Sequence, residues 1–247
     1  MDKMLYISMS TAQQTMRAQA ANSNNLANLN TTGFRADFEQ FRSIPVMGEG
    51  VPSRVYSASE RIATNFQQGT LQSTGRELDI SVQGEGFIAV QGKDGREGYT
   101  RAGDLRVTSS GQLITGTGLV VLGEGGPISI PAAEKVEIGS DGTISIRPLG
   151  SAASALAQLD RIKLVKPEIG QLQKSADGLI RLVDGTDAPS DASVKVASGT
   201  LESSNVNAVG ALVNMISLQR QYEMQIKMMS TAQENSTASA RLLQLGS

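Results

Sequence analysis

The hydrophobic pattern of this chain changes period twice, and this change constrains the fold more than any other feature. Near each end, apolar residues recur at steps of three or four, the spacing of one face of an α-helix. Between the ends, apolar and polar residues alternate, as in half-buried β-strands. The 247 residues are enough to bury a sizeable core. The pattern predicts an α+β protein with a helix at each end and a central antiparallel all-β domain.

A long helix is predicted at each end of the chain. Residues 1–33 contain no proline, and Gly33 is both their first glycine and a stop signal. Residues 205–247 contain no proline and predict a helix of roughly 35 to 40 residues, least certain around Gly210. The first apolar stripe is Leu5, Met9, Ala12, Met16, Ala20 and Ala27. The second is heptad-like and runs through Ala208, Leu212, Met215, Gln219, Tyr222, Ile226, Met229, Gln233, Ser236, Ala240 and Leu243.

The middle of the chain predicts strands joined by tight turns. Alternating apolar residues occur at Leu78/Ile80/Val82, Leu105/Val107, Ile128/Ile130, Val136/Ile138, Ile144/Ile146, Ile162/Leu164 and Val194/Val196. Asp-Gly pairs at 94–95, 141–142, 177–178 and 184–185 suit turns that need a positive φ. We therefore expect a β domain over 73–204. Residues 34–72, which hold two prolines and isolated apolar side chains, are expected to form an extended connecting arm.

Both predicted helices carry few charges. Their charged residues are Asp2, Lys3 and Arg17 in the first helix and Arg220, Glu223, Lys227, Glu234 and Arg241 in the second. One interpretation is a helical hairpin whose polar face is solvated. The other is that the helices pack against further copies of the chain, because hydrogen-bonded amides and hydroxyls are buried at lower cost than unpaired charges.

Asparagine is concentrated at the end of the first helix, with five in the nine residues 22–30. Asparagine is a poor helix former, so its density needs a reason. Buried amides can fix the register of a helix bundle, since a slipped alignment leaves donors unpaired. Alternatively, these residues cap a frayed helix end. The sequence leaves both interpretations open.

Composition excludes several kinds of site. The chain has no Cys, His or Trp, which rules out disulfides, thiolate and histidine metal sites, and Ser-His-Asp triads. With 22 basic and 24 acidic residues, nothing favours nucleic acid or anionic lipid as a partner. No apolar run reaches the roughly 20 residues of a membrane span, and no cleavable signal is evident. Composition alone therefore indicates the cytoplasm.

Two weak motifs suggest small-molecule chemistry. Residues 84–89 (GEGFIA) match a dinucleotide fingerprint, but that motif needs a following helix, and Phe87 onward predicts a strand. The carboxylates of Glu77, Asp79 and Glu85 could supply the acid pair of a glycosidase. A secreted carboxylate-dependent glycan hydrolase or a glycan-binding β module is thus the alternative from a different functional class. We predict no catalytic, cofactor or metal site.

Longer motifs occur in order along the whole chain. They are SNNLANLNTTGFR at 23–35, GRELDISVQGEGF at 75–87, YTRAGDL at 99–105, LESSNVN at 201–207, LVNMI at 212–216 and QRQYE at 219–223. These motifs resemble those of the bacterial flagellar axial proteins, the rod and hook family. Ser23 and Arg35 are mild departures, since the family usually has Ala and Lys there. Residues 1–10 and 224–229 most resemble the proximal rod proteins, with the distal rod proteins as the close alternative.

The resemblance implies a structural protein rather than an enzyme. In the family, the terminal helices form a coiled-coil-like core domain, here 1–33 and 205–247, that lines a narrow channel, and the β domain lies outside it. Family members are exported unfolded through the flagellar type III export apparatus, without cleavage, and assemble beyond the cytoplasmic membrane. The resemblance therefore implies the periplasmic rod of the basal body rather than the cytoplasm, with no membrane-embedded segment. It also implies torque transmission, no cofactor, and helices that are loosely ordered in the free monomer.

The expected partners are copies of this chain, other rod and axial proteins, and the export apparatus. We expect the assembly interface to lie mainly on the terminal helices and the Asn-rich segment. Its predicted members are Leu5, Met9, Met16, Asn24, Asn25, Leu26, Asn28, Asn30, Gly33, Phe34, Asn205, Asn207, Leu212, Met215, Tyr222, Ile226, Met229 and Leu243.

Overall fold

The chain folds into two units, which we call the helical unit and the β unit. The structure, a computed structural model, describes residues 3–45, 55–148, 150 and 157–245, and leaves aside the side chains of 3, 39–45, 55–62 and 242–245. The helical unit comprises 1–29, 36–65 and 206–247, and the β unit comprises 30–35 and 66–205. The α+β class predicted from the sequence is confirmed.

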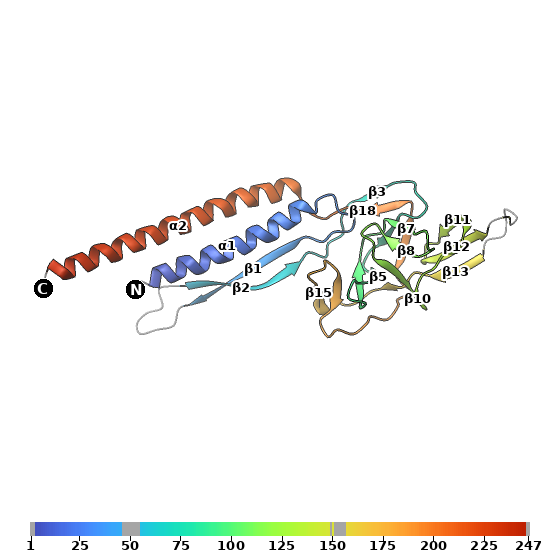
Figure 1. Cartoon of the computed structure of the whole chain (residues 1–247), viewed down its shortest axis with the longest axis horizontal. Coiled ribbons are helices and arrows are strands. Elements are labelled where there is room, and N and C mark those ends of the chain that lie inside the picture. Colours follow the sequence, from blue (N-terminus) through green and yellow to red (C-terminus); the bar gives the residue numbers. More distant parts are fainter. Residues whose placement is uncertain (1–2, 46–54, 149, 151–156, 246–247) are drawn as a thin grey trace. The chain divides into compact units, whose positions relative to one another are not determined.

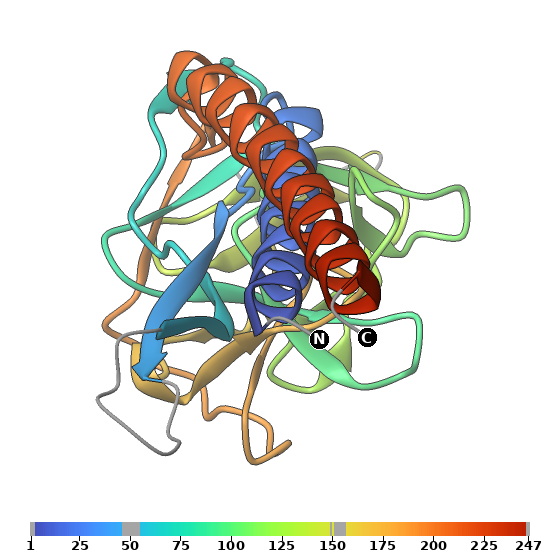
Figure 2. The ribbon, with the colours of Figure 1, turned by 90° about the vertical axis from the view of Figure 1, so that its left-hand side faces the viewer.

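The helical unit is a pair of antiparallel helices with a β-ribbon. Helix α1 (Lys3–Ala27) packs against helix α2 (Ala208–Leu245), and the two run side by side in both views (Figures 1 and 2). Strands β1 (Asp37–Pro45) and β2 (Val55–Thr64) pair antiparallel and also pack against α1. Within residues 34–72, for which we expected an extended arm, these two strands form a ribbon that belongs to the helical unit.

Asparagine side chains mark one end of each helix. Helix α1 ends at Ala27, six residues before Gly33, and the Asn28 side chain donates to the carbonyl of Asn24 over 2.9 Å. Such local side-chain bonds compete with continued helix. At the start of α2, the Gly210 N–H donates to Oδ1 of Asn207 over 3.0 Å, which makes Asn207 an N-cap. Helix α2 is 38 residues long, within the predicted length.

The β unit is built of antiparallel strands. Among the described residues, its largest sheet has nine strands in the order β15-β16-β6-β5-β9-β8-β7, with β10 on β9 and β14 on β5. Smaller sheets are β11-β12-β13, β17-β4 and β18-β3. The strands of the large sheet are β5 (Phe87–Gln91), β6 (Glu97–Thr100), β7 (Leu105–Val107), β8 (Leu113–Thr115), β9 (Val120–Gly123), β10 (Gly126–Pro127), β14 (Leu164–Val165), β15 (Leu172–Lys174) and β16 (Ile180–Leu182). The others are β3 (Leu71–Ser73), β4 (Ile80–Gln83), β11 (Ala133–Ile138), β12 (Thr143–Pro148), β13 (Ala157–Arg161), β17 (Lys195–Ser198) and β18 (Thr200–Glu202), with a 3₁₀ turn at Ile169–Gln171.

Strand β5 is buried on both faces. Ile88 and Val90 belong to the main core cluster, whereas Phe87 and Ala89 belong to a second cluster that includes Tyr99. Successive side chains of a strand point to opposite faces, so β5 separates the two cores. The main cluster contains a buried member of each alternating pair predicted from the sequence. The β unit thus buries two clusters of large apolar side chains within itself.

The predicted turns are present. The glycines of all four Asp-Gly pairs have positive φ values, between 74° and 86°. The GEGFIA segment is a turn that leads from β4 directly into strand β5 at Phe87. No helix follows to direct its N-terminus at a dinucleotide, so the interpretation of this motif as a turn is confirmed.

Candidate assembly interface

Helix α1 buries small polar residues and exposes large apolar ones. Ser8, Ala12, Thr15, Asn22 and Asn25 are its buried residues. On other faces the exposed fractions are 47% for Tyr6, 53% for Met9 and 55% for Met16. Of the predicted apolar stripe, only Ala12 is buried. The side of α1 that packs within the chain is therefore not the side with the large apolar side chains.

Two threonine hydroxyls on α1 are satisfied within the helix itself. The Thr11 hydroxyl donates to the carbonyl of Ile7, and the Thr15 hydroxyl donates to the carbonyl of Thr11, each over 2.9 Å. This back-bonding lets a polar residue such as Thr15 be buried without an unpaired donor. The small residues of this face therefore suit packing inside the helical unit.

Helix α2 also has two faces. Apart from Gly210, its less exposed positions alternate in steps of three and four, the spacing of a coiled-coil seam: Ala208, Ala211, Met215, Leu218, Tyr222, Gln225, Met229 and Ala232. The Asn22 side chain donates to the carbonyl of Ala211 over 2.7 Å, so this seam is the side toward α1. Met215, Tyr222 and Met229 of the predicted interface lie in the seam. Leu212 and Ile226 lie one residue beyond seam positions and are 48% and 44% exposed.

The outward side of α2 is apolar near its start and polar near its end. Exposed apolar residues on α2 are Val209, Leu212, Val213, Ile216, Met224, Ile226 and Met228. From Gln233 to Arg241 every residue is exposed. Figure 1 shows the reason: the C-terminal part of α2 extends beyond the N-terminal end of α1, its partner helix. The last turns of α2 therefore have no neighbour among the described residues of the helical unit.

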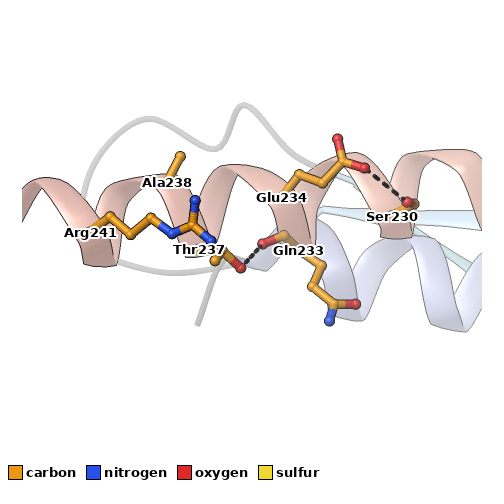
Figure 3. Close-up of a pocket in the computed structure, with 6 residues that line it drawn as sticks. All are labelled: Ser230, Gln233, Glu234, Thr237, Ala238 and Arg241. Carbon is orange, nitrogen blue, oxygen red and sulfur yellow. Dashed lines mark hydrogen bonds between the residues drawn. The ribbon is translucent and has the colours of Figure 1, made fainter.

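A shallow hollow lies on this exposed part of α2 (Figure 3). It is lined by Ser230, Gln233, Glu234, Thr237, Ala238 and Arg241, all from one helix. The Ser230 hydroxyl donates to Glu234 over 3.4 Å, and the Thr237 hydroxyl donates to the carbonyl of Gln233 over 2.9 Å. A hollow with walls from a single helix cannot enclose a small ligand. It is part of the unpaired helix surface.

The Asn-rich segment serves both roles that the sequence left open. Asn25 Nδ2 donates to the carbonyl of Asp37 over 2.6 Å, and the Asp37 N–H donates back to Asn25 Oδ1 over 2.8 Å. Asn25 thus ties α1 to β1, while Asn22 ties α1 to α2, so these two buried amides fix register within the chain. Asn28 caps the helix end. Asn24 and Asn30 are exposed.

The other predicted interface residues are spread over both units. Leu5 and Leu26 are half-buried on α1. Gly33, Phe34 and Asn205 lie in the β unit, where Gly33 is buried and the Lys174 ammonium sits 4.1 Å from the centre of the Phe34 ring. Leu243 lies near the end of α2, and its side chain is outside the described residues.

The three carboxylates considered for glycan hydrolysis each have a separate partner. Glu77 pairs with Lys135 at 3.1 Å, and Glu85 pairs with Lys166 at 3.2 Å. Asp79 accepts a hydrogen bond from the Thr74 hydroxyl over 2.8 Å. Hydrogen bonds with the Glu137 and Glu77 carboxylates raise the pKa of Lys135, as expected of surface ion pairs. No feature of these contacts singles out an acid–base pair. Among the described residues, no group of three or more acidic side chains is placed to hold a metal ion.

Comparisons with known proteins cover the whole chain. Family models match residues 5–35 (flagella basal body rod protein), 81–146 (flagellar hook protein FlgE/F/G D1 domain) and 197–242 (flagellar basal body rod FlgEFG protein C-terminal). The chain is 40% identical to the flagellar basal-body rod protein FlgF of Escherichia coli, over 99% of this chain and all of that protein. This chain belongs to the flagellar basal-body rod protein family.

Within the family, the alignments with FlgF cover more of the chain than those with FlgG. The chain is 32% identical to FlgF of Caulobacter vibrioides over 98% of both chains. It is 32% identical to FlgG of Bacillus subtilis over 85% of this chain and 88% of that protein. The segments that the family models match contain most of α1, the centre of the β unit and most of α2. No helix in the described residues combines the length and apolar character of a membrane span.

A buried ion cluster in the β unit was not anticipated as a site. Glu202 is fully buried, and Arg35 and Arg101 are 2% and 4% exposed. Arg35 Nη1 lies 2.5 Å from Glu202 Oε1, and Arg101 Nη1 lies 3.0 Å from Glu202 Oε2. Burial lowers the pKa of Arg101, and the Glu202 carboxylate opposes that shift. The three residues come from three separate family motifs, which is the one signal that could have indicated them.

Proposed function

We propose that this protein is a structural subunit of the proximal rod of the flagellar basal body, where it polymerises into the hollow drive shaft with copies of itself and other axial proteins. The observation that carries the proposal is the division of each terminal helix into two faces. The small and polar side of α1 pairs inside the chain, and large apolar side chains remain exposed on both helices. Family membership and the fuller alignments with FlgF support the proximal assignment.

Exposed apolar side chains on two neighbouring helices favour burial against other subunits. Val209, Leu212, Val213 and Ile216 lie within two turns of α2, with exposed fractions of 48% to 70%. Contiguous apolar surface of this kind marks interaction sites on soluble proteins. A head-to-tail contact between unlike surfaces extends into an open helical polymer. The outward face of α2 is therefore suited to lateral packing in a rod.

The predicted interface residues divide into two groups under this proposal. Met9, Met16, Leu212 and Ile226, together with the exposed amides of Asn24 and Asn30, make contacts between subunits. The inward residues of the predicted set, above all Asn25, hold α1 in place within the helical unit. This division assigns the register-fixing amides an indirect part in assembly.

The proposal includes the route of export and the place of assembly. The subunit leaves the cytoplasm unfolded through the flagellar type III apparatus, without cleavage, and assembles in the periplasm. The scarcity of charge on both helices supports burial in a polymer, since buried unpaired charges are costly. The role is mechanical, transmitting torque and extending the channel.

The test is to place a charge on the outward face of α2. In a strain that lacks the chromosomal copy, we expect Leu212→Asp to abolish swimming and to leave isolated basal bodies without the subunit. Ile169→Asp is the matched control, because Ile169 is 55% exposed in the β unit and lies outside the proposed interface. It should assemble normally. Normal incorporation of the Leu212→Asp protein into rods would contradict the proposal.

A further inference from the structure

The chain passes between the two units at four points, and three segments of the β unit adjoin these points. The passages lie at 29/30, 35/36, 65/66 and 205/206. The β-unit segments next to them are residues 30–35, 66–70 and 200–205, which we call the joining segments. They lie far apart in the sequence, so something in the β unit must hold them together.

One residue contacts all three joining segments. The backbone carbonyl of Glu202 accepts the Gly33 N–H over 2.7 Å, and its carboxylate pairs with Arg35. Oε1 of the same carboxylate accepts the Gly69 N–H over 2.9 Å. Glu202 itself lies in the third segment, at the end of β18, where it pairs in register with Leu71 of β3.

Arg101 anchors Glu202 to the centre of the β unit. In addition to the ion pair, Arg101 donates to the carbonyl of Val82 over 3.1 Å and to the carbonyl of Gly84 over 2.5 Å. Its guanidinium also lies 5.3 Å from the centre of the Phe87 ring. The cluster is therefore bonded to β4 and to the turn before β5.

The backbones at this point approach as closely as glycine allows. A Cβ atom on Gly33 would lie 2.2 Å from the Arg101 carbonyl carbon, and one on Gly69 would lie 2.1 Å from the Ser203 oxygen. Direct bonds link the segments as well: Asn205 donates from its N–H to the Phe34 carbonyl over 3.3 Å and from Nδ2 to the Gln67 carbonyl over 2.8 Å. The three segments thus form one closely packed joint.

We propose that Glu202 is a positioning residue that fastens all three joining segments to the β unit, so that they order and loosen together. A fully buried carboxylate between two buried guanidiniums has this effect because removing its charge leaves both cations unpaired. The coupling is a property of the single chain and does not rest on rod assembly.

Hydrogen exchange of the full-length protein tests this coupling. Glu202→Gln preserves the shape of the side chain and removes its charge. We expect amide exchange to become at least tenfold faster in all three joining segments and to change by less than twofold in β5. Glu77→Gln is the matched control, since Glu77 is a half-exposed carboxylate in a surface ion pair, and it should change none of these rates.

Either of two results with Glu202→Gln would overturn the proposal. Acceleration of one joining segment alone would mean that the segments are independent. Equal acceleration of β5 and the joining segments, with the β unit still folded, would mean that Glu202 stabilises the whole core rather than the joint.

A second variant decides the matter if Glu202→Gln does not fold. Arg35→Met removes one of the two cations and leaves Glu202 paired with Arg101, so the cluster is electrically balanced. We expect faster exchange in 30–35 and also in 66–70 and 203–205, with β5 unchanged. Acceleration confined to residues 30–35 would refute the shared joint.

Discussion

The two units differ in which side chains they bury. In the β unit, large aliphatic residues such as Ile88, Leu105 and Ile144 are fully buried. In the helical unit, small and polar residues such as Ser8 and Asn22 are buried while Met16 and Val209 are more than half exposed. The β unit therefore forms its own core, whereas the helical unit leaves many large apolar side chains exposed. Under the proposed function, the exposed apolar side chains of the helical unit are the ones that contact other subunits.

The largest expected effect on monomer stability is in the β core. Leu105→Ala removes a fully buried side chain from β7 and should lower the free energy of unfolding by about 2–5 kcal/mol. Val107→Ala is the control from the same strand, where Val107 is 37% exposed and the cost should stay below about 1 kcal/mol. Urea unfolding followed by far-UV circular dichroism measures both. Equal costs at the two positions would contradict the self-contained core.

A smaller effect is expected where α1 is tied to the ribbon. Asn25→Ala removes both hydrogen bonds to the Asp37 backbone, and the loss should cost the helical unit about 1–3 kcal/mol. Hydrogen exchange at residues 37–40 should speed up, and rod assembly should fall while the β unit stays folded. Asn24→Ala, at the exposed neighbouring position, should leave exchange unchanged. If Asn24→Ala accelerated exchange at residues 37–40 as much as Asn25→Ala, the register role of Asn25 would be wrong.

The stability of the β unit should also fall at alkaline pH because of one tyrosine, Tyr99. Burial raises the pKa of Tyr99 to about 12, and its hydroxyl oxygen accepts the Ala188 N–H over 2.6 Å. Because the folded pKa lies above the unfolded value of about 10, the β unit should keep this stability below pH 10 and lose it as the pH rises toward 12. Urea unfolding at pH 9, 10 and 11 measures the slope. Tyr99→Phe should flatten it, and an unchanged slope would assign the loss to other groups.

The smallest expected effect is on the outward face of α2. Met224→Gln exchanges an exposed apolar side chain for a polar one and should change monomer stability by no more than about 0.5 kcal/mol. Competition against the wild-type protein for incorporation into rods should nevertheless reveal a deficit. If the variant destabilised the monomer instead, Met224 would contribute to packing within the single chain, and the difference in burial between the two units would be smaller than described.

Much of the β unit could be predicted from the sequence because its signals are local. Alternating pairs such as Ile128 and Ile130 lie in the main core, and the Asp-Gly pairs mark turns. The β-ribbon at β1 and β2 was missed, since its apolar residues do not alternate clearly and its strands are defined only by pairing with one another. The ion cluster was missed for a related reason: Arg35 and Glu202 are brought together only by the fold.

The sequence by itself determined the two terminal helices, the antiparallel β centre and the family, since each depends on residues near one another or on ordered motifs. The tertiary structure alone decided which face of each helix is turned inward. A pattern of apolar residues allows either Ala211 or Leu212 as the seam position, but the seam of α2 toward α1 holds Ala211 and leaves Leu212 exposed. Close packing against the small residues of α1 favours the smaller side chain, and hydrophobicity along one helix contains no information about the size of its neighbour.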